Sequence, residues 1–129
     1  MKRVRILLAD DHTEMLKRVV HLLQSDFEVV GAVNDGQALL EAASQLRPDV
    51  VVLDISMPLM NGLEAADRLR KAGSRAKVVF LTVHEGPDFV LESRASGALG
   101  YVVKPRLTSD LVPAIKEALA NRSFVSPQP

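Results

Sequence analysis

The sequence predicts an α/β protein built on a doubly wound parallel sheet of five strands. Short runs of apolar and β-branched residues alternate with longer stretches in which apolar residues recur at helical spacing. The third run, VVVL, is apolar at every position, as a strand has to be when helices cover both faces of its sheet. Together these two observations indicate five consecutive βα units.

The five strands are predicted at the apolar runs. These runs span residues 4–9, 27–33, 50–53, 77–81 and 100–103. Residues that favour turns, such as Asp35-Gly36 and Gly73-Ser74, stand between the segments. Turn chemistry therefore falls where a strand and a helix have to be joined.

The helices are predicted in the stretches TEMLKRVVHLL, GQALLEAASQL and LEAADRLRKA and near the C-terminus. In the first stretch, one helical face carries the apolar residues Met15, Val19, Leu22 and Leu23. The last helix is expected to begin near Asp110. An N-cap there would put Pro113 in the first turn, where its missing N–H costs no intrahelical hydrogen bond.

Length and composition suit one domain. The chain has 129 residues, of which 47% are hydrophobic. We predict this domain over residues 1–122 and interpret SFVSPQP, residues 123–129, as a C-terminal tail or the start of a linker.

Charge and cysteine content exclude several classes of function. Lys and Arg number 16, as do Asp and Glu, so we expect no direct binding of nucleic acid by this chain. The absence of cysteine excludes thiolate catalysis and fits a reducing compartment. No signal-peptide pattern and no run of roughly 20 apolar residues is present. We therefore expect a soluble, cytoplasmic protein without a membrane partner.

A carboxylate, a hydroxyl or an ammonium group directly follows four of the five predicted strands. Asp10 and Asp11 follow the first strand, Asp54 the third, Thr82 the fourth and Lys104 the fifth. In a doubly wound sheet, the ligand site lies outside the carboxyl ends of the strands. These residues are therefore expected to converge in space.

The chemistry of this set indicates phosphoryl transfer. Three neighbouring carboxylates repel one another, and an all-oxygen site of this kind suits Mg²⁺. With Mg²⁺, the Lys104 ammonium and the Thr82 hydroxyl would hold the oxygens of a phosphoryl group. Asp54 would then be the nucleophile that forms an aspartyl phosphate.

The motifs LLADDH, VLDISMPLMNG, VVFLTVH and GALGYVVKP resemble the receiver domain of two-component response regulators over essentially the whole chain. The forms DDH, LDISMP and MNGLEA are most similar to NarL/FixJ-like receivers, which usually precede a helix-turn-helix output domain. The resemblance implies a flavodoxin-like (βα)5 fold with strand order 2-1-3-4-5 and a role in transcription regulation.

The resemblance also implies roles for single residues. Asp54 would be the phospho-acceptor, Asp11 would bind Mg²⁺ directly, Asp10 would help directly or through water, and the backbone carbonyl of Ser56 would be a further ligand. Three residues at the ends of the last two strands complete the implied site. Thr82 and Lys104 would hold the phosphoryl oxygens, and Tyr101 would be an aromatic switch that rotates inward as Thr82 moves toward the phosphate. The bond from Lys104 to Pro105 is usually cis in this family.

We therefore expect a signalling phospho-acceptor that catalyses its own phosphorylation and dephosphorylation, with no turnover of another substrate. The phosphodonor would be a cognate histidine kinase or a small phosphodonor. Partners, including a second copy of the chain, would bind the surface of the fourth helix, the fifth strand and the fifth helix. Candidate contact residues there are Phe89, Val90, Leu91, Arg94, Leu111, Ile115 and Lys116.

Three residues near the site are expected to set phosphoryl lifetime. Many receivers have a smaller residue where this chain has Val83, so we hypothesise slower exchange of the phosphoryl group. Ser56 and His84 stand two positions after Asp54 and Thr82, where receivers tune the access of water.

Other classes fit the sequence less well. A haloacid-dehalogenase-like phosphatase needs a second Asp where this chain has Ser56. An FMN carrier needs a hydroxyl- and glycine-rich loop where this chain has DDHTE, and a nicotinamide-binding domain needs G-x-G-x-x-G, which is absent. A receiver-like module that acts by protein contact without phosphorylation stays open, although every catalytic position is filled.

Overall fold

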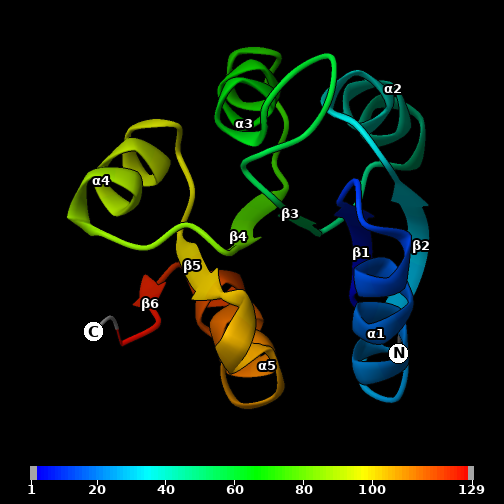
Figure 1. Ribbon diagram of the computed structural model, residues 1–129. Helices are drawn as coiled ribbons and strands as arrows, with labels where there is room; N and C mark the ends of the chain where they lie inside the picture. The colour runs from blue at the N-terminus through cyan, green and yellow to red at the C-terminus, as the bar shows by residue number, and fades with distance from the viewer. Residues whose placement is uncertain (1–2, 128–129) are drawn as a thin grey trace.

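A computed structural model describes residues 3–127 and shows a parallel sheet between two layers of helices (Figure 1). The strands lie in the order β2-β1-β3-β4-β5-β6, and every neighbouring pair is parallel. Their bounds are β1 Arg5–Ala9, β2 Glu28–Val33, β3 Val50–Leu53, β4 Lys77–Thr82, β5 Gly100–Val103 and β6 Phe124–Val125. The doubly wound fold and the order 2-1-3-4-5 are confirmed.

The helices divide between the two faces of the sheet (Figure 1). Their bounds are α1 Thr13–Leu23, α2 Gly36–Leu46, α3 Gly62–Lys71, α4 Pro87–Ala95 and α5 Leu107–Leu119, with a short 3-10 helix, η1, at Lys104–Arg106. Apolar residues of α1 and α5 pack on one face, and those of α2, α3 and α4 pack on the other. None of the helices in the described part of the chain is long and apolar enough to cross a membrane.

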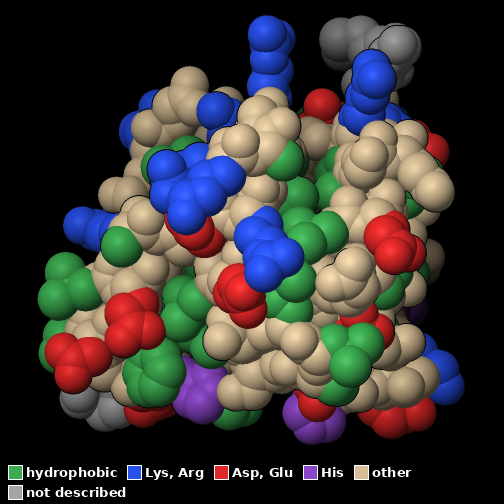
Figure 2. Space-filling model, turned by 90° about the horizontal axis from the view of Figure 1, so that it is seen from above, with side chains coloured by type: hydrophobic (Ala, Val, Ile, Leu, Met, Phe, Trp, Pro, Cys, Tyr) green, Lys and Arg blue, Asp and Glu red, His purple; other side chains and the backbone are tan. Residues whose placement is uncertain are grey.

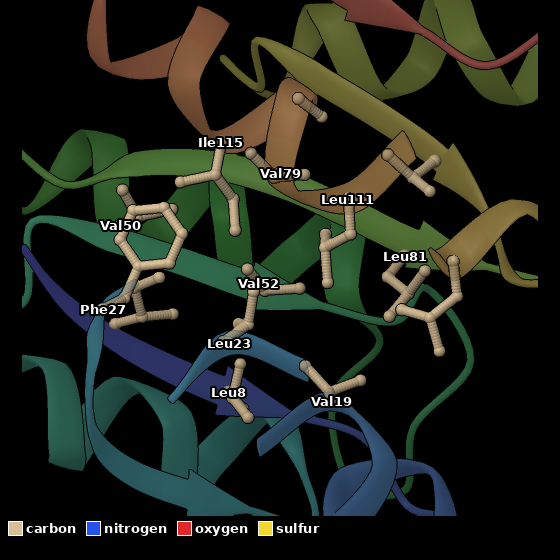
Figure 3. Packing of buried hydrophobic residues seen from close by; sticks show 14 of the residues in the cluster. Leu8, Val19, Leu23, Phe27, Val50, Val52, Val79, Leu81, Leu111 and Ile115 are labelled. Carbon is tan, nitrogen blue, oxygen red and sulfur yellow. The ribbon is translucent and has the colours of Figure 1, made fainter. Parts of the chain in front are cut away.

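Strand β3 shows why its sequence is apolar throughout. Val50 and Val52 point toward α1 and α5, where they pack with Leu8, Val79, Leu111 and Ile115 (Figure 3). Val51 and Leu53 point the other way, into the cluster formed with α2 and α3. Successive side chains of a strand alternate between faces, so a central strand covered on both sides has no position for a polar residue.

Two helices begin where the sequence offers an N-cap. The Asp35 carboxylate accepts a hydrogen bond from the Ala38 N–H at 2.7 Å at the start of α2. The Asn61 side chain accepts one from the Glu64 N–H at 2.9 Å at the start of α3. Each cap satisfies a backbone donor that has no partner within the helix.

The expected start of the last helix is wrong. Helix α5 begins at Leu107, so Asp110 lies within it, and Pro113 lies in its interior rather than in its first turn. Leu107 and Leu111 are buried in the core, and the Asp110 carboxylate is hydrogen-bonded by side chains of Arg106, Ser109 and Ser126. These contacts extend the helix toward η1 and leave Asp110 with a different role from that of an N-cap.

The segment interpreted as a tail contributes a sixth strand. Phe124 and Val125 form β6, which pairs in parallel with Gly100 and Tyr101 of β5. Where the domain ends along the chain stays a prediction, because the pairing of these two residues does not define a boundary.

The cis peptide bond implied by the resemblance is absent. No peptide bond within residues 3–127 is cis, so Lys104 and Pro105 are joined by a trans bond. Pro105 lies in the first turn of η1, where a backbone N–H has no partner within the helix and its loss costs nothing.

Candidate functional site

The structure brings the predicted polar residues together at the carboxyl edge of the sheet. Asp10 follows β1 and Asp54 follows β3, which are neighbouring strands. Thr82 ends β4 and Lys104 follows β5, and all four side chains are buried. The chain leaves β1 and β3 toward opposite sides of the sheet, which is the point where this fold class forms ligand sites.

Lys104 connects two of the carboxylates. Its Nζ lies 2.9 Å from Asp10 Oδ2 and 2.9 Å from Asp54 Oδ2. Burial by itself would lower the pKa of Lys104, but the hydrogen bonds to Asp10 and Asp54 outweigh it, and the pKa is raised. The ammonium is therefore charged at neutral pH and partly offsets the repulsion between the acids.

The Asp54 carboxylate is held by both of its oxygens. Oδ2 accepts from Lys104, and Oδ1 accepts from the Ile55 N–H at 2.7 Å. The Asp54 N–H donates to the Ala9 carbonyl at 3.0 Å, which continues the pairing of β3 with β1 beyond the last residue of each strand. The side chain that was predicted to react is thus fixed in one orientation by the sheet.

Gly62 packs directly against the backbone of Asp54. A Cβ at Gly62 would lie 1.9 Å from the Asp54 carbonyl oxygen, far inside van der Waals contact. The Gly62 N–H donates to the Ile55 carbonyl at 2.7 Å. Gly62 directly follows Asn61 in the sequence, and no local signal shows that α3 approaches Asp54 so closely.

The acidic residues form a cluster that can hold a metal ion. Ligand atoms of Asp10, Asp11, His12 and Asp54 all lie within 4.8 Å of one another. Three of the four donors are carboxylates, and such oxygen-rich ligation fits Mg²⁺. His12 was not predicted as a ligand, and its Nδ1 lies 3.1 Å from both Asp10 Oδ1 and Asp11 Oδ1.

His84 lies at the mouth of the site and contacts three of its neighbours. Its Nε2 is 2.6 Å from Ser56 Oγ, and its ring stacks on Phe89 with centroids 4.6 Å apart. Its backbone N–H donates to Thr82 Oγ1 at 3.3 Å. The two residues that the sequence placed at matching positions after Asp54 and Thr82 are therefore in direct contact.

Tyr101 is already turned inward in this structure. The residue is 1% exposed, and its hydroxyl donates to the His84 carbonyl at 2.8 Å. Burial raises the pKa of Tyr101 to about 12, and the negative charges of Asp54 and Glu85 act in the same direction. Tyr101, which the resemblance predicts to be a switch, is thus in an inward position and is joined to the loop that follows Thr82.

The expected partner surface is smaller than predicted. Leu111 and Ile115 are fully buried and cannot contact a partner, and β6 covers the outer edge of β5. Leu91 on α4 is 64% exposed. Figure 2 shows hydrophobic side chains beside acidic ones on the left, over α4. Val83 is also exposed, at 62%, directly after Thr82.

Comparison with known proteins agrees with this geometry. A family model described as response regulator receiver domain matches residues 6–116. The nitrate/nitrite response regulator protein NarL of Escherichia coli is 36% identical over 123 residues, which are 94% of this chain and 57% of that protein. Response regulator GacA of Pseudomonas aeruginosa is 34% identical over 128 residues, 97% of this chain and 59% of that protein.

A solved structure is similar in the same way. The signal receiver domain of a response regulator from Mycobacterium tuberculosis, also named NarL, superimposes with a TM-score of 0.90 at 31% identity and covers 95% of this chain and 100% of that one. The chain spans a little over half the length of the curated relatives that it matches. The match to the family model and the shared fold show that the chain belongs to the receiver domains of two-component response regulators.

Proposed function

We propose that Asp54 accepts a phosphoryl group from a histidine kinase or a small phosphodonor, with Mg²⁺ held by Asp10, Asp11 and Asp54 and by the Ser56 carbonyl. The observation that carries the proposal is the buried contact of Lys104 with both Asp10 and Asp54. A lysine in this place balances the acids before transfer and is within reach of a phosphoryl group bonded to Asp54.

The transfer step balances as an in-line displacement. An oxygen of the Asp54 carboxylate attacks phosphorus, the new P–O bond forms as the P–N bond of a phosphohistidine breaks, and the electron pair of that bond stays on the imidazole. Lys104 then donates to a phosphoryl oxygen, and the Thr82 hydroxyl donates to another. When bound by these carboxylates, Mg²⁺ would neutralise part of the negative charge that gathers at Asp54 during the transfer.

The same residues support signalling rather than turnover. Ser56 stands where an Asp-nucleophile phosphatase has its second acid, and the Ser56 hydroxyl is engaged by His84 at 2.6 Å. Hydrolysis therefore depends on the access of water to Asp54 and has no dedicated general base. The domain catalyses its own phosphorylation and dephosphorylation and processes no further substrate.

The signal is a change of charge read through the β4–α4 loop. A phosphoryl group adds roughly two negative charges at Asp54. Thr82 moves toward it, and the backbone of His84 follows because its N–H is bonded to Thr82 Oγ1 and its carbonyl to the Tyr101 hydroxyl. To take the domain from mostly inactive to mostly active, phosphorylation has to favour the active state by about 3 to 5 kcal/mol.

The output is proposed to be transcription, in the cytoplasm, by way of protein contacts. Several relatives are named as transcriptional regulatory proteins. The surface of α4, β6 and α5, with Leu91 at its exposed part, is proposed to contact a partner or a second copy of the chain.

Intact mass after incubation with acetyl phosphate and Mg²⁺ tests the proposal. One phosphoryl group is expected on the chain and none on Asp54→Asn or with a chelator. Calorimetric titration of Mg²⁺ without a phosphodonor is expected to show binding that Asp11→Asn loses and Asp26→Asn, an exposed control, keeps. No added mass on a folded protein would instead support a module that acts by protein contact alone.

A further inference from the structure

The side chain of Ser126 makes a contact that the proposed phosphotransfer does not use. Ser126 is 1% exposed although it is the last but one of the described residues. Its Oγ donates to Asp110 Oδ2 at 2.7 Å and accepts from the Val103 N–H at 3.3 Å. A buried serine hydroxyl with both a donor and an acceptor partner is fixed in place.

This contact fastens the short strand β6. The Phe124 N–H donates to the Leu99 carbonyl at 3.0 Å, and the Ser126 N–H donates to the Tyr101 carbonyl at 2.8 Å. The Ser126 hydroxyl oxygen accepts a hydrogen bond from the N–H of Val103, the next backbone donor along β5. The side chain of Ser126 thereby adds one more hydrogen bond to those made by the backbones of β5 and residues 124–126.

The Asp110 carboxylate, which accepts from Ser126, also accepts hydrogen bonds from Arg106 and Ser109. Arg106 Nε lies 2.7 Å from Asp110 Oδ2, and Ser109 Oγ donates to Oδ1 at 2.9 Å. Burial by itself would raise the pKa of Asp110, but the hydrogen bonds from Arg106, Ser126 and Ser109 lower it. Asp110 is thus ionised at neutral pH and holds Ser126 through a charge-assisted hydrogen bond.

The contact lies one residue from the phospho-acceptor site. Val103, bonded to Ser126, directly precedes Lys104, whose ammonium lies 2.9 Å from Asp54. Tyr101, whose carbonyl accepts from Ser126, directs its hydroxyl to the loop after Thr82. Tyr101 and Val103 of β5 are therefore bonded to Ser126 and also lie next to the groups that surround Asp54.

We propose that residues 124–126 are a detachable latch, which Ser126 fastens to Asp110 and β5 and which closes more tightly when Asp54 is phosphorylated. The latch rests on the proposed function of Asp54. Its direction follows from the proposal that phosphorylation favours the inward Tyr101, whose carbonyl accepts from the Ser126 N–H in this structure. A strand of two residues opens locally at low free energy, so a small change at β5 alters how often it is attached.

Coupling of this kind acts in both directions. If phosphorylation favours the attached latch, the attached latch favours the inward position of Tyr101 to the same extent. Loss of Ser126 should therefore loosen Tyr101 even in the unphosphorylated chain. This consequence can be measured directly, because Tyr101 is the one tyrosine of the sequence and there is no tryptophan.

Hydrogen–deuterium exchange tests the link to Asp54. On the full chain treated with acetyl phosphate and Mg²⁺, the Phe124 and Ser126 amides are expected to exchange about fivefold or more slowly than without the phosphodonor. Ser126→Ala should take up the phosphoryl group, since Ser126 does not touch the site, but should exchange fast in both states. Unchanged exchange on a chain that mass spectrometry shows to be phosphorylated would overturn the latch.

Acrylamide quenching of tyrosine fluorescence tests the latch without phosphorylation. Quenching of Tyr101 is expected to rise in Ser126→Ala and in Asp110→Asn, which removes the charge at the other end of the contact. It should stay unchanged in Ser123→Ala, an exposed serine three residues earlier. Unchanged quenching in both latch variants, with circular dichroism showing an intact fold, would refute the coupling even if Asp54 is phosphorylated normally.

If the chain takes up no phosphoryl group, the proposed function fails while the quenching result still decides whether Ser126 holds Tyr101. Increased quenching would then support only the attachment and overturn its control by phosphorylation. The two failures are therefore distinguishable by mass and by fluorescence.

Discussion

Ser56 Oγ and His84 Nε2 lie 2.6 Å apart and join the loop after β3 to the loop after β4 across the mouth of the phospho-acceptor site. His84 is at the same time stacked on Phe89 of α4 and bonded through its carbonyl to the Tyr101 hydroxyl. His84 thus connects the loop after β3 with α4 and Tyr101, which are expected to carry the signal.

Breaking this contact should shorten the life of the phosphoryl group. Ser56→Ala and His84→Ala are each expected to raise the rate of dephosphorylation about three- to tenfold, the equivalent of one hydrogen bond, because the loops can then separate and admit water. The rate follows from intact mass over time after removal of the phosphodonor. The double variant should lose its phosphoryl group no faster than either single variant. Additive increases in the rate of dephosphorylation would show that the two residues act separately. His21→Ala, an exposed histidine on α1, is the control.

The size of the Val83 side chain is expected to affect the rate of dephosphorylation as well. Val83 is 62% exposed and stands directly after Thr82. Val83→Ala is expected to speed both uptake and loss of the phosphoryl group, because a smaller side chain opens the approach to Asp54. A dephosphorylation rate equal to that of the unmodified chain would remove this explanation.

The sequence predicted the strands and the candidate site well, because the position of a residue in a buried parallel strand restricts which residue types can occur there. Runs such as VVVL predicted the strands, and the polar residue after each run predicted the site, because parallel strands end at one edge. Lys104 and Asp54 are 50 residues apart in the chain, yet both could be placed from the pattern alone.

Contacts between distant elements could not be read in this way. The two-residue strand β6 has no periodicity to detect, and Ser126 gains its role only from the position of Asp110 on α5. Asp110 looked like an N-cap because the local sequence does not show that Arg106 and Ser126 occupy its carboxylate. His12 directly follows Asp10 and Asp11 in the sequence, but only the structure shows that its Nδ1 lies 3.1 Å from both carboxylates.

Gly62 is predicted to be essential for the position of Asp54. The Cβ of Gly62→Ala would lie 1.9 Å from the Asp54 carbonyl, so α3 or the end of β3 has to move. We expect a loss of about 3 kcal/mol or more in the free energy of unfolding, together with loss of phosphorylation. Urea denaturation and intact mass measure the two effects.

Gly73→Ala is the matched control for that variant. Its Cβ would meet nothing within 4 Å, and the expected cost of about 1 kcal/mol comes from its positive φ of 84° alone. Equal losses for Gly62→Ala and Gly73→Ala would show that close packing on Asp54 is unimportant.

Titration of Tyr101 should reveal its burial. Its pKa is raised from the ordinary 10.0 to about 12, so the phenol stays neutral in the folded protein at a pH where it ionises in the unfolded chain. This contribution to stability is fully present below pH 10 and is lost as the pH rises from there toward 12. Ultraviolet difference absorption of the one tyrosine measures the midpoint, and a midpoint near 10 with an intact circular dichroism spectrum would contradict the inward position.

Asp110 should make stability depend on acid pH. Its pKa is lowered below 3.8, so its contribution is present above that pH and is lost as the pH falls through the lower value of the folded state. Asp110→Asn is expected to reduce the free energy of unfolding by about 1 to 3 kcal/mol at pH 7, where the carboxylate accepts from Arg106, Ser109 and Ser126.

The difference between Asp110→Asn and the unmodified chain should shrink as the carboxyl group becomes protonated, because a neutral carboxyl and an amide hold Arg106 about equally weakly. Urea denaturation at pH 7 and pH 3 measures the two differences, with Asp26→Asn as the exposed control. A difference that is the same at both pH values would mean that the side chain stabilises α5 by its shape alone. The charge of Asp110 would then not be what holds Ser126 against β5.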